Sequence, residues 1–373
     1  MLTYFLFLFF CRFLLTQAAV VPVSARVGNN GDKRIKCENL RSCEECTNTT
    51  TATGGRCEWC GADSTCRRFL FNTCSLNARV AHPYGCAKPV PQKIYDEQFA
   101  ISTVLPFIGA SYSDNPKEMA EVLQGCFEKI EVINSHVIVD PSNLSDWFAY
   151  SAYLPKKDAI VVVFRGSTSI FQLIDQGISF FLHPRVSNPS TGGLVDDYYL
   201  QAFHTFWKAG MKKDFEAALS KHPKAHIWCF GHSLGGSLAS LAAAHISARY
   251  KKKEKIQLVT FGQPKLGDMN FAEGHTKLVP NAVRVVHDKD PVPALPPRLF
   301  HWGLGEQDWI HHHYEVRYKS SMRRGAPHKI SRFPDSSSND LGLILSLSLR
   351  DHLMYFEEDL SRWHHLGCRK KQQ

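Results

Sequence analysis

The sequence predicts an α/β fold with a mostly parallel central sheet, preceded by a small disulfide-rich module. From residue 94 onward, short apolar segments alternate with longer helical ones, a pattern typical of a parallel sheet with helices on both faces. Eight cysteines lie between residues 37 and 86. In "WCFGHSLGGSLASLAAAH" (228–245), Ser233 stands between Gly231 and Gly235 where an apolar run becomes alanine-rich. This G-x-S-x-G pattern predicts a sharp strand-to-helix turn that presents the serine.

The chain begins with an apolar run followed by small residues, "MLTYFLFLFFCRFLLTQAAVVPVSA". We interpret residues 1–19 as a secretory signal peptide, cut after Ala18, Ala19 or Ala25. Arg12 interrupts the run, and a membrane anchor would need about 20 uninterrupted apolar residues. The later apolar segment 341–349 is too short to span a membrane. We therefore expect a secreted, extracellular protein.

The cysteine-rich stretch 37–86 has few aliphatic residues and cannot fold on a hydrophobic core alone. Dense, even-numbered cysteines behind a signal peptide predict a disulfide framework. The two C-x2-C pairs also permit zinc binding, but the oxidising context favours disulfides. The spacing around Cys-Glu-Trp-Cys resembles the small module of plexins, semaphorins and integrins, which implies a spacer or a site for a protein partner. The candidate disulfide cysteines here are Cys37, Cys43, Cys46, Cys57, Cys60, Cys66, Cys74 and Cys86.

Two sequons, at Asn48 and Asn143, are candidate glycosylation sites. The proline-containing stretch 87–93 is interpreted as a linker. The segments that follow predict helices over 116–130, 195–223 and 234–250 and one that begins near residue 347, and strands over 158–166, 225–230, 256–262, 282–287 and 314–318.

Composition is ordinary for a globular protein, with 44% hydrophobic and 21% charged residues. The formal net charge of +9 favours a solvated basic surface; anionic lipid is an alternative partner. The basic runs at 251–255 and 368–373 are short and accompany no known binding module, so we expect no nucleic-acid partner.

A serine needs a neutral imidazole to take its proton and an acid to orient that imidazole. Asp290 follows the strand 282–287, and Asp288 is its nearby rival. Among 18 histidines, His352 lies downstream, which completes the order serine, acid, histidine. The triplet 311–313 suggests a metal cluster, but consecutive strand residues face opposite ways, so structural or surface histidines are expected there.

The motifs "FRGSTS", "GHSLGG", "VTFGQPKLGD", "HDKDPVPALPP" and "DHLMYF" occur in this order. Over residues 94–368 the chain thereby resembles the class 3 lipases of filamentous fungi, and the added cysteine-rich extension resembles secreted animal members. The resemblance implies an α/β-hydrolase fold with Ser233 as nucleophile, Asp290 as acid and His352 as base. It also implies an oxyanion hole formed by Ser167 and the backbone N–H of Leu234, and no cofactor or metal.

The same resemblance implies two further features. A mobile lid helix would occupy residues 169–184, with an apolar face that also fits an ordinary buried helix; its candidate residues are Ile170, Phe171, Leu173, Ile174, Ile178 and Phe180. A disulfide would join Cys126 to Cys368. Cys229, inside the strand before the serine, is expected to be a buried apolar residue.

These observations predict a secreted serine hydrolase that cleaves acylglycerol esters at a lipid–water interface through an acyl-enzyme. A phospholipase A1 or a short-chain esterase would use the same residues. A non-catalytic interaction protein on a hydrolase scaffold is the alternative from another class.

Overall fold

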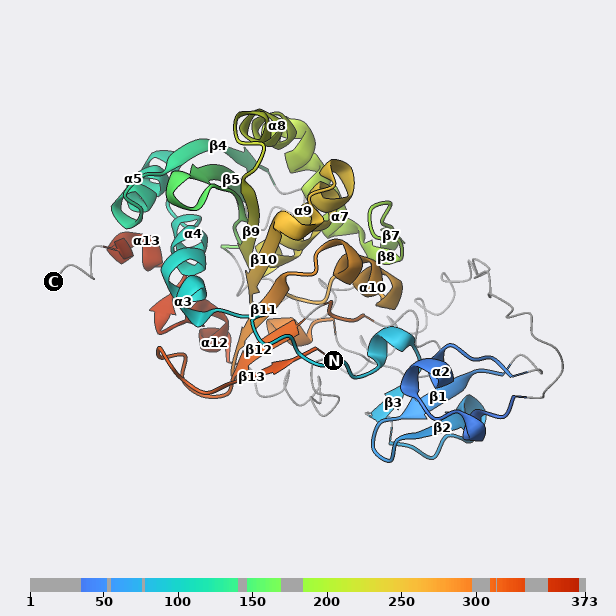
Figure 1. The fold of residues 1–373 in the computed structure, drawn as a ribbon. Coiled ribbons are helices and arrows are strands. Elements are labelled where there is room, and N and C mark those ends of the chain that lie inside the picture. The colour runs from blue at the N-terminus through green and yellow to red at the C-terminus, as the bar shows by residue number, and fades with distance from the viewer. Residues whose placement is uncertain are drawn as a thin grey trace, which may run out of the picture. The chain divides into compact units, whose positions relative to one another are not determined.

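A computed structural model of the chain describes residues 35–51, 55–75, 78–139, 146–168, 184–296, 309–312, 314–332 and 348–368. Its largest element is an eight-stranded sheet in the order β13-β12-β11-β10-β9-β6-β5-β4 (Figure 1). The strands are β4 (Glu131–Ile138), β5 (Trp147–Leu154), β6 (Ala159–Phe164), β9 (His226–His232), β10 (Ile256–Phe261), β11 (Ala282–His287), β12 (Tyr314–Tyr318) and β13 (His328–Ser331). The five strands from β6 to β12 pair in parallel, and the pairings at both ends of the sheet are antiparallel. The sheet is therefore mixed and mostly parallel, as the sequence predicted.

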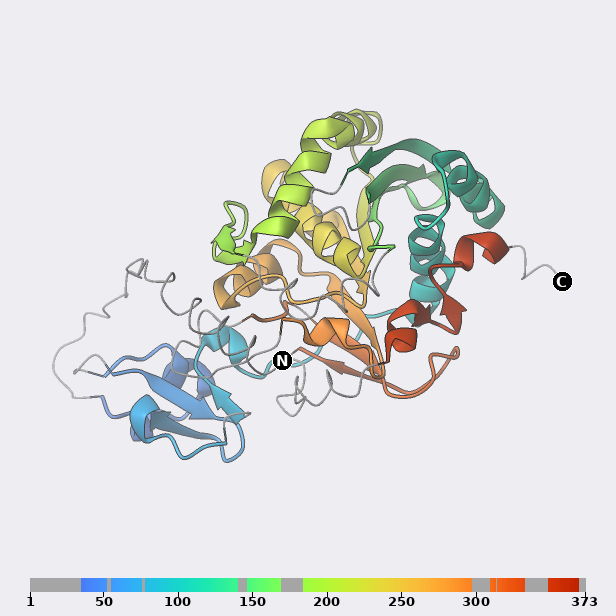
Figure 2. The same cartoon turned by 180° about the vertical axis from the view of Figure 1, so that it is seen from behind.

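Helices cover both faces of this sheet, as Figures 1 and 2 show from opposite sides. One face packs against α7 (Asp197–Phe206), α8 (Lys212–Lys221), α9 (Leu234–Tyr250) and α10 (Met269–Leu278). The other packs against α3 (Glu97–Phe99), α4 (Leu105–Ala110), α5 (Pro116–Cys126) and α13 (Trp363–Leu366).

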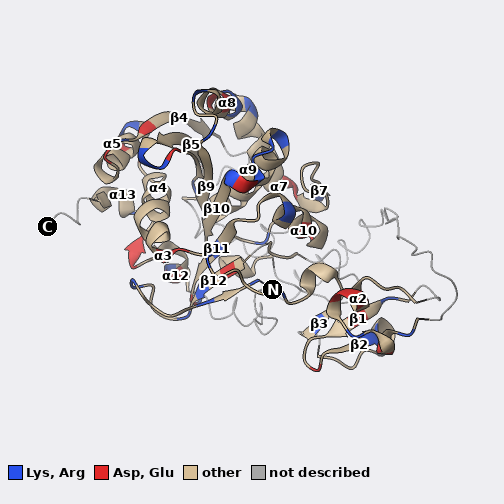
Figure 3. Cartoon of the chain, viewed as in Figure 1, with Lys and Arg blue, Asp and Glu red and all other residues tan. Residues whose placement is uncertain are grey.

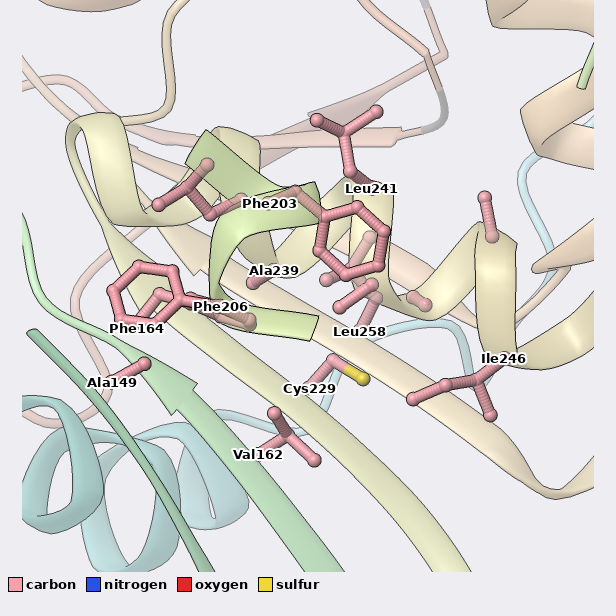
Figure 4. Packing of buried hydrophobic residues seen from close by; sticks show 14 of the residues in the cluster. Ala149, Val162, Phe164, Phe203, Phe206, Cys229, Ala239, Leu241, Ile246 and Leu258 are labelled. Atoms are coloured by element: carbon pink, nitrogen blue, oxygen red, sulfur yellow. The ribbon is translucent and has the colours of Figure 1, made fainter. Parts of the chain in front are cut away.

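Alternation along the central strands assigns residues to these two faces. In β6, Val162 belongs to the first core, whereas Val161 and Val163 belong to the second. Successive strand residues point to opposite faces, so a strand between two helical layers must be apolar throughout. This explains the uninterrupted run "AIVVVF". Cys229 lies among Val162, Leu258 and Ile246 in the first core (Figure 4), and burial raises the pKa of its thiol to about 12.

Three helix predictions were wrong in extent. The predicted helix over 116–130 ends at Cys126. The predicted helix over 195–223 is interrupted by a turn of π-helix at Trp207–Met211, where Gly210 has φ +140°, a conformation that favours glycine. The predicted terminal helix ends at Leu353. The residues that follow form a hairpin of two short strands, β14 (Met354–Tyr355) and β15 (Glu358–Asp359). The chain turns between them because Phe356 and Glu357 both adopt positive φ. The sequence analysis also missed β4, β5, β13 and α10.

The cysteine-rich stretch contains a three-stranded sheet, ordered β2 (Thr65–Arg68), β1 (Cys57–Cys60), β3 (Arg79–Val80). Its eight cysteines pair as Cys37–Cys57, Cys43–Cys86, Cys46–Cys66 and Cys60–Cys74. Three of their sulfurs, on Cys37, Cys57 and Cys66, lie within 4.8 Å of one another, but each is already in a disulfide. The pairing therefore leaves no thiolates here for zinc.

Charged side chains of both signs are interspersed on the ribbon, for example along α8 (Figure 3). Among the described residues, no helix is both long enough and apolar enough to cross a membrane. Asn48 is exposed, as a glycosylation acceptor must be. Asn143, the six lid candidates and the signal peptide lie outside the described residues.

Candidate active site

Ser233 lies at a sharp turn between β9 and α9, as the G-x-S-x-G pattern predicted. Its φ is +55°, an uncommon value for a residue with a side chain. A Cβ on Gly231 would collide with the carbonyl oxygen of Gly235, and a Cβ on Gly235 would collide with that of Phe164. Backbone occupies both positions, so glycine is required on either side of the serine. Ser233 itself is 2% exposed.

The acid and the histidine come together from distant parts of the chain. Asp290 follows β11, and His352 lies in α12 (Leu349–Leu353). His352 Nδ1 donates to Asp290 Oδ1 at 2.8 Å, and both side chains are fully buried. Asp288, the rival carboxylate, is only partly buried; its backbone oxygen accepts from Arg317. Of the two carboxylates, Asp290 is the one that contacts the histidine.

Three donors surround the Asp290 carboxylate. Besides His352, the Val292 N–H donates to Oδ1 at 3.0 Å and the Tyr355 hydroxyl donates to Oδ2 at 2.8 Å. Burial alone would raise the pKa of Asp290, but His352 and the hydrogen bonds outweigh it and lower the pKa below its ordinary value. Asp290 is therefore ionised at neutral pH and suited to orient an imidazole and stabilise its charged form.

His232 connects the serine turn to the histidine segment. Its Nε2–H donates to the backbone oxygen of His352 at 2.7 Å, and the Tyr112 hydroxyl donates to its Nδ1 at 2.7 Å. Burial, and then the nearby His352, lower the pKa of His232 to about 3. His232 therefore stays neutral and keeps both hydrogen bonds over the physiological pH range.

The loop after β6 lies directly against the serine turn. A Cβ on Gly166 would come within 3.0 Å of Ser233 Cβ and 2.8 Å of the His232 oxygen. Ser167, the next residue, is 8% exposed. Leu234 is the first residue of α9, where backbone N–H groups have no partner within the helix and favour a negative charge. Leu234 thus follows Ser233 directly, and Ser167 follows the glycine that packs against Ser233.

The predicted nucleophile and base are not joined by a hydrogen bond in the described part of the chain. Among the described residues, no hydrogen bond joins Ser233 to His352, and the buried Nε2 of His352 has no partner. That nitrogen is the one a serine proton would reach. Nucleophile–base hydrogen bonds are often long in ligand-free enzymes, so this arrangement is compatible with the predicted chemistry.

Two tyrosines, Tyr112 and Tyr355, and His232 support the site, and the sequence analysis assigned them no role. Tyr355 lies three residues after His352 in "DHLMYF", so the motif itself carried that signal. His232 is inside the serine motif. Tyr112 carried none, since it lies 120 residues before its partner.

Buried polar side chains form hydrogen bonds with α9 and with the loop after Asp290. Lys265, 2% exposed, donates to the backbone oxygens of Ala294 and Pro296, which holds the turn after Asp290. His311 Nε2 donates to the Pro293 oxygen, and His312 contacts Ser240 Oγ. These two members of the histidine triplet are thus structural and buried, not at the surface. His313 lies outside the described residues.

Comparison with known proteins finds lipases similar to this chain. Residues 161–300 match the family Lipase (class 3). The nematode Lipase ZK262.3 of Caenorhabditis elegans is 29% identical over 240 residues, covering 56% of this chain and 65% of the relative. Secreted mono- and diacylglycerol lipase 1 of Fusarium solani is 33% identical over 152 residues, covering 41% and 44%. The chain thus spans less than two thirds of the length of these relatives.

Solved structures share the fold. A triacylglycerol lipase described as having a serine-protease-like catalytic triad superposes with a TM-score of 0.59 at 22% identity, covering 72% of this chain and 97% of that one. Lipase II from Rhizopus niveus superposes with a TM-score of 0.57 at 22% identity, covering 70% and 95%. Residues 161–300 thus match the class 3 lipases, and the chain carries an α/β-hydrolase-like fold.

Proposed function

We propose that the protein is a serine esterase that hydrolyses acylglycerols, with Ser233 as nucleophile, His352 as general base and Asp290 as the orienting acid. The observation that carries this proposal is the buried Asp290–His352 hydrogen bond, beside a serine on a sterically forced turn. The match of residues 161–300 to the class 3 lipases supports the ester as the reacting bond.

The reaction follows from these positions. His352 Nε2 takes the Ser233 proton as Oγ attacks the ester carbonyl, and Asp290 stabilises the imidazolium that forms. The Leu234 N–H and Ser167 would donate to the oxyanion. Collapse releases the alcohol, which takes its proton from His352. Water activated by the same histidine then frees the fatty acid.

The related lipases support acylglycerols as substrates. The Fusarium solani relative is named for mono- and diacylglycerols and the superposed structure for triacylglycerols. Segment 169–184, with its six apolar lid candidates, is proposed to cover the acyl site and to open at a lipid surface, where exposure of apolar side chains is favourable.

Released fatty acid tests the proposal. Wild type and Ser233→Ala would be incubated with emulsified triolein, tributyrin and phosphatidylcholine. Ser237→Ala is the matched control, because Ser237 is buried in α9, the helix that follows Ser233. Among the described residues, its hydroxyl has no hydrogen-bond partner. We expect release by wild type and the control and none by Ser233→Ala. Preference for phosphatidylcholine or tributyrin would instead favour a phospholipase or a short-chain esterase, and no release by folded protein would favour a scaffold.

We further propose that the protein is extracellular. Five disulfides and the secreted fungal relative support this. Residues 1–19 would be removed as a signal peptide, 37–86 would form the interaction module and 94–368 the lipase domain. Amino-terminal sequencing of the secreted protein would test the first assignment: a start at Met1 would contradict it.

A further inference from the structure

His364, in the short helix α13, is buried without the partners that its ring requires. It is 6% exposed, and in the described part of the chain neither Nδ1 nor Nε2 has a hydrogen-bond partner. Buried polar groups in proteins are almost always hydrogen-bonded, so an imidazole with two unpartnered nitrogens calls for a ligand or an explanation.

Two other metal-binding side chains meet His364 at this place. The rings of His364 and His365 have centroids 4.0 Å apart. Glu118, in α5, faces them, and one donor atom from each of the three residues lies within 4.8 Å of the others. Glu118 Oε2 accepts the backbone N–H of Asp114 at 2.8 Å, which fixes the carboxylate and leaves Oε1 as the second oxygen.

The three donors border a cavity. Its volume is about 230 Å³, and Glu121 and Gly125 of α5 line it together with His364 and His365. A space of this size accommodates an ion and a water ligand.

We propose that His364, His365 and Glu118 form a Zn²⁺ site, with water from the cavity as the fourth ligand. Two imidazoles and one carboxylate are a donor set that Zn²⁺ uses, at about 2.0–2.2 Å from each atom. The exposed His365 side chain can rotate to complete this shorter geometry. Ca²⁺ and Mg²⁺ prefer sites made of oxygen atoms alone, so neither should compete.

The bound ion would link α5 to the carboxyl-terminal segment. The Cys126–Cys368 disulfide joins the same two parts of the chain, and His352 lies twelve residues before His364 in that segment. The site is separate from Ser233 and plays no part in the proposed ester chemistry. Its role would be to stabilise the segment that carries the histidine.

Metal content of the full-length chain tests the proposal. After removal of metal by a chelator, each protein would be dialysed against buffered Zn²⁺ and its zinc measured by mass spectrometry, with Co²⁺ absorption as a second readout. The variants are His365→Ala, whose side chain is exposed, and Glu118→Gln, which retains an oxygen for the Asp114 N–H. Neither removes the buried ring of His364, so both should fold. His226→Ala, an exposed histidine at the start of β9, is the control.

We expect wild type and the control to bind one more zinc per chain than either variant, with the absorption of tetrahedral Co²⁺. Zn²⁺ should raise the Tm of wild type and the control only, since ligands that bind the folded state stabilise it, and Ca²⁺ should not. Equal zinc in wild type and both variants, or no zinc in wild type, would overturn the proposal.

Discussion

The serine turn and the histidine segment reach the same site by opposite means. Ser233 is positioned by close backbone packing, because the backbone of Gly235 leaves no room for a side chain at Gly231, and the backbone of Phe164 leaves none at Gly235. His352 is positioned by contacts from distant residues: Asp290 holds its ring, and His232 holds its backbone. Backbone sterics thus place the nucleophile, whereas hydrogen bonds from side chains place the base.

The largest effect should follow from a substitution that breaks the close backbone packing at the serine turn. In Gly235→Ala, the new Cβ would collide with the carbonyl oxygens of Phe164 and Arg165, which are backbone and cannot move aside. We expect at least about 3 kcal/mol of destabilisation and loss of the reactive serine. Urea unfolding and labelling of Ser233 with a fluorophosphonate would measure both.

Gly125→Ala is the matched control for that substitution. Gly125 lies in α5, and a Cβ there meets nothing within 4 Å. Alanine should stabilise this helix by up to about 1 kcal/mol. Equal stability losses in the two variants would contradict the steric account of the serine turn.

On the long-range side, Tyr355→Phe removes the donor to Asp290 Oδ2 and leaves that buried oxygen unpaired. A hydrogen bond to a charged group contributes about 1.5–3 kcal/mol, so we expect kcat to fall by about 10- to 100-fold. Loss of this hydrogen bond should also raise the pKa of Asp290, which moves the acid limb of the kcat profile to higher pH. Initial rates on dissolved tributyrin from pH 4 to 9 would measure it.

Tyr318→Phe controls for the loss of a tyrosine hydroxyl elsewhere. Its hydroxyl contacts Tyr95 and Glu97, away from Ser233. An unchanged acid limb in Tyr355→Phe, or the same shift in Tyr318→Phe, would refute a role for Tyr355 in positioning the acid.

A smaller effect on kcat is expected from Tyr112, which contacts His352 only through His232. Tyr112→Phe removes the hydroxyl that donates to His232 Nδ1, while His232 still donates to the His352 backbone. We expect kcat to fall about 3- to 10-fold with little change in KM, since a neutral hydrogen bond contributes about 1 kcal/mol. Tyr95→Phe is the control, and a double-mutant cycle with His232→Gln should show coupling. Strict additivity would mean that the two residues act independently.

The smallest effect at neutral pH is expected on stability, from the buried His275, which contacts Ser240 of α9. Burial lowers the pKa of His275 to about 4, below the value of about 6.5 in an unfolded chain. As pH falls from about 6.5 to 4, the unfolded state binds a proton that the folded state does not, so stability decreases by up to about 1.4 kcal/mol per pH unit.

In His275→Gln this contribution is absent, so stability should depend less steeply on pH in that range. Urea unfolding at pH 5, 6 and 7 would measure the slope, with the exposed His328→Gln as control. An unchanged slope in His275→Gln would show that His275 is not kept neutral by burial.

The same contrast explains which parts were predictable from sequence. The serine turn, its flanking strand and helix, and the five parallel strands follow from local spacing and apolar runs. Gly210 and the hairpin at 354–359 interrupt apolar periodicity that continues through them, so pattern alone predicts helix there. β4 has a half-buried, irregular pattern because it is the edge strand, and such a pattern fits several structures.

Site support was the least predictable part. The pairing of Asp290 with His352 came from the order of motifs and from a family resemblance, since nothing local distinguishes His352 among 18 histidines. Tyr112 and Lys265 act through contacts that only the folded chain creates. Their roles depend on burial and on distance, neither of which a linear sequence contains.

The Cys126–Cys368 disulfide joins residues separated by 242 positions and so closes most of the α/β-hydrolase-like fold into a covalent ring. A protease that cuts the ring once produces two pieces that remain attached to each other. Such a nicked molecule would migrate as fragments only after reduction. After a single cleavage at the surface, the fragment that carries His352 therefore stays covalently attached to the rest of the site.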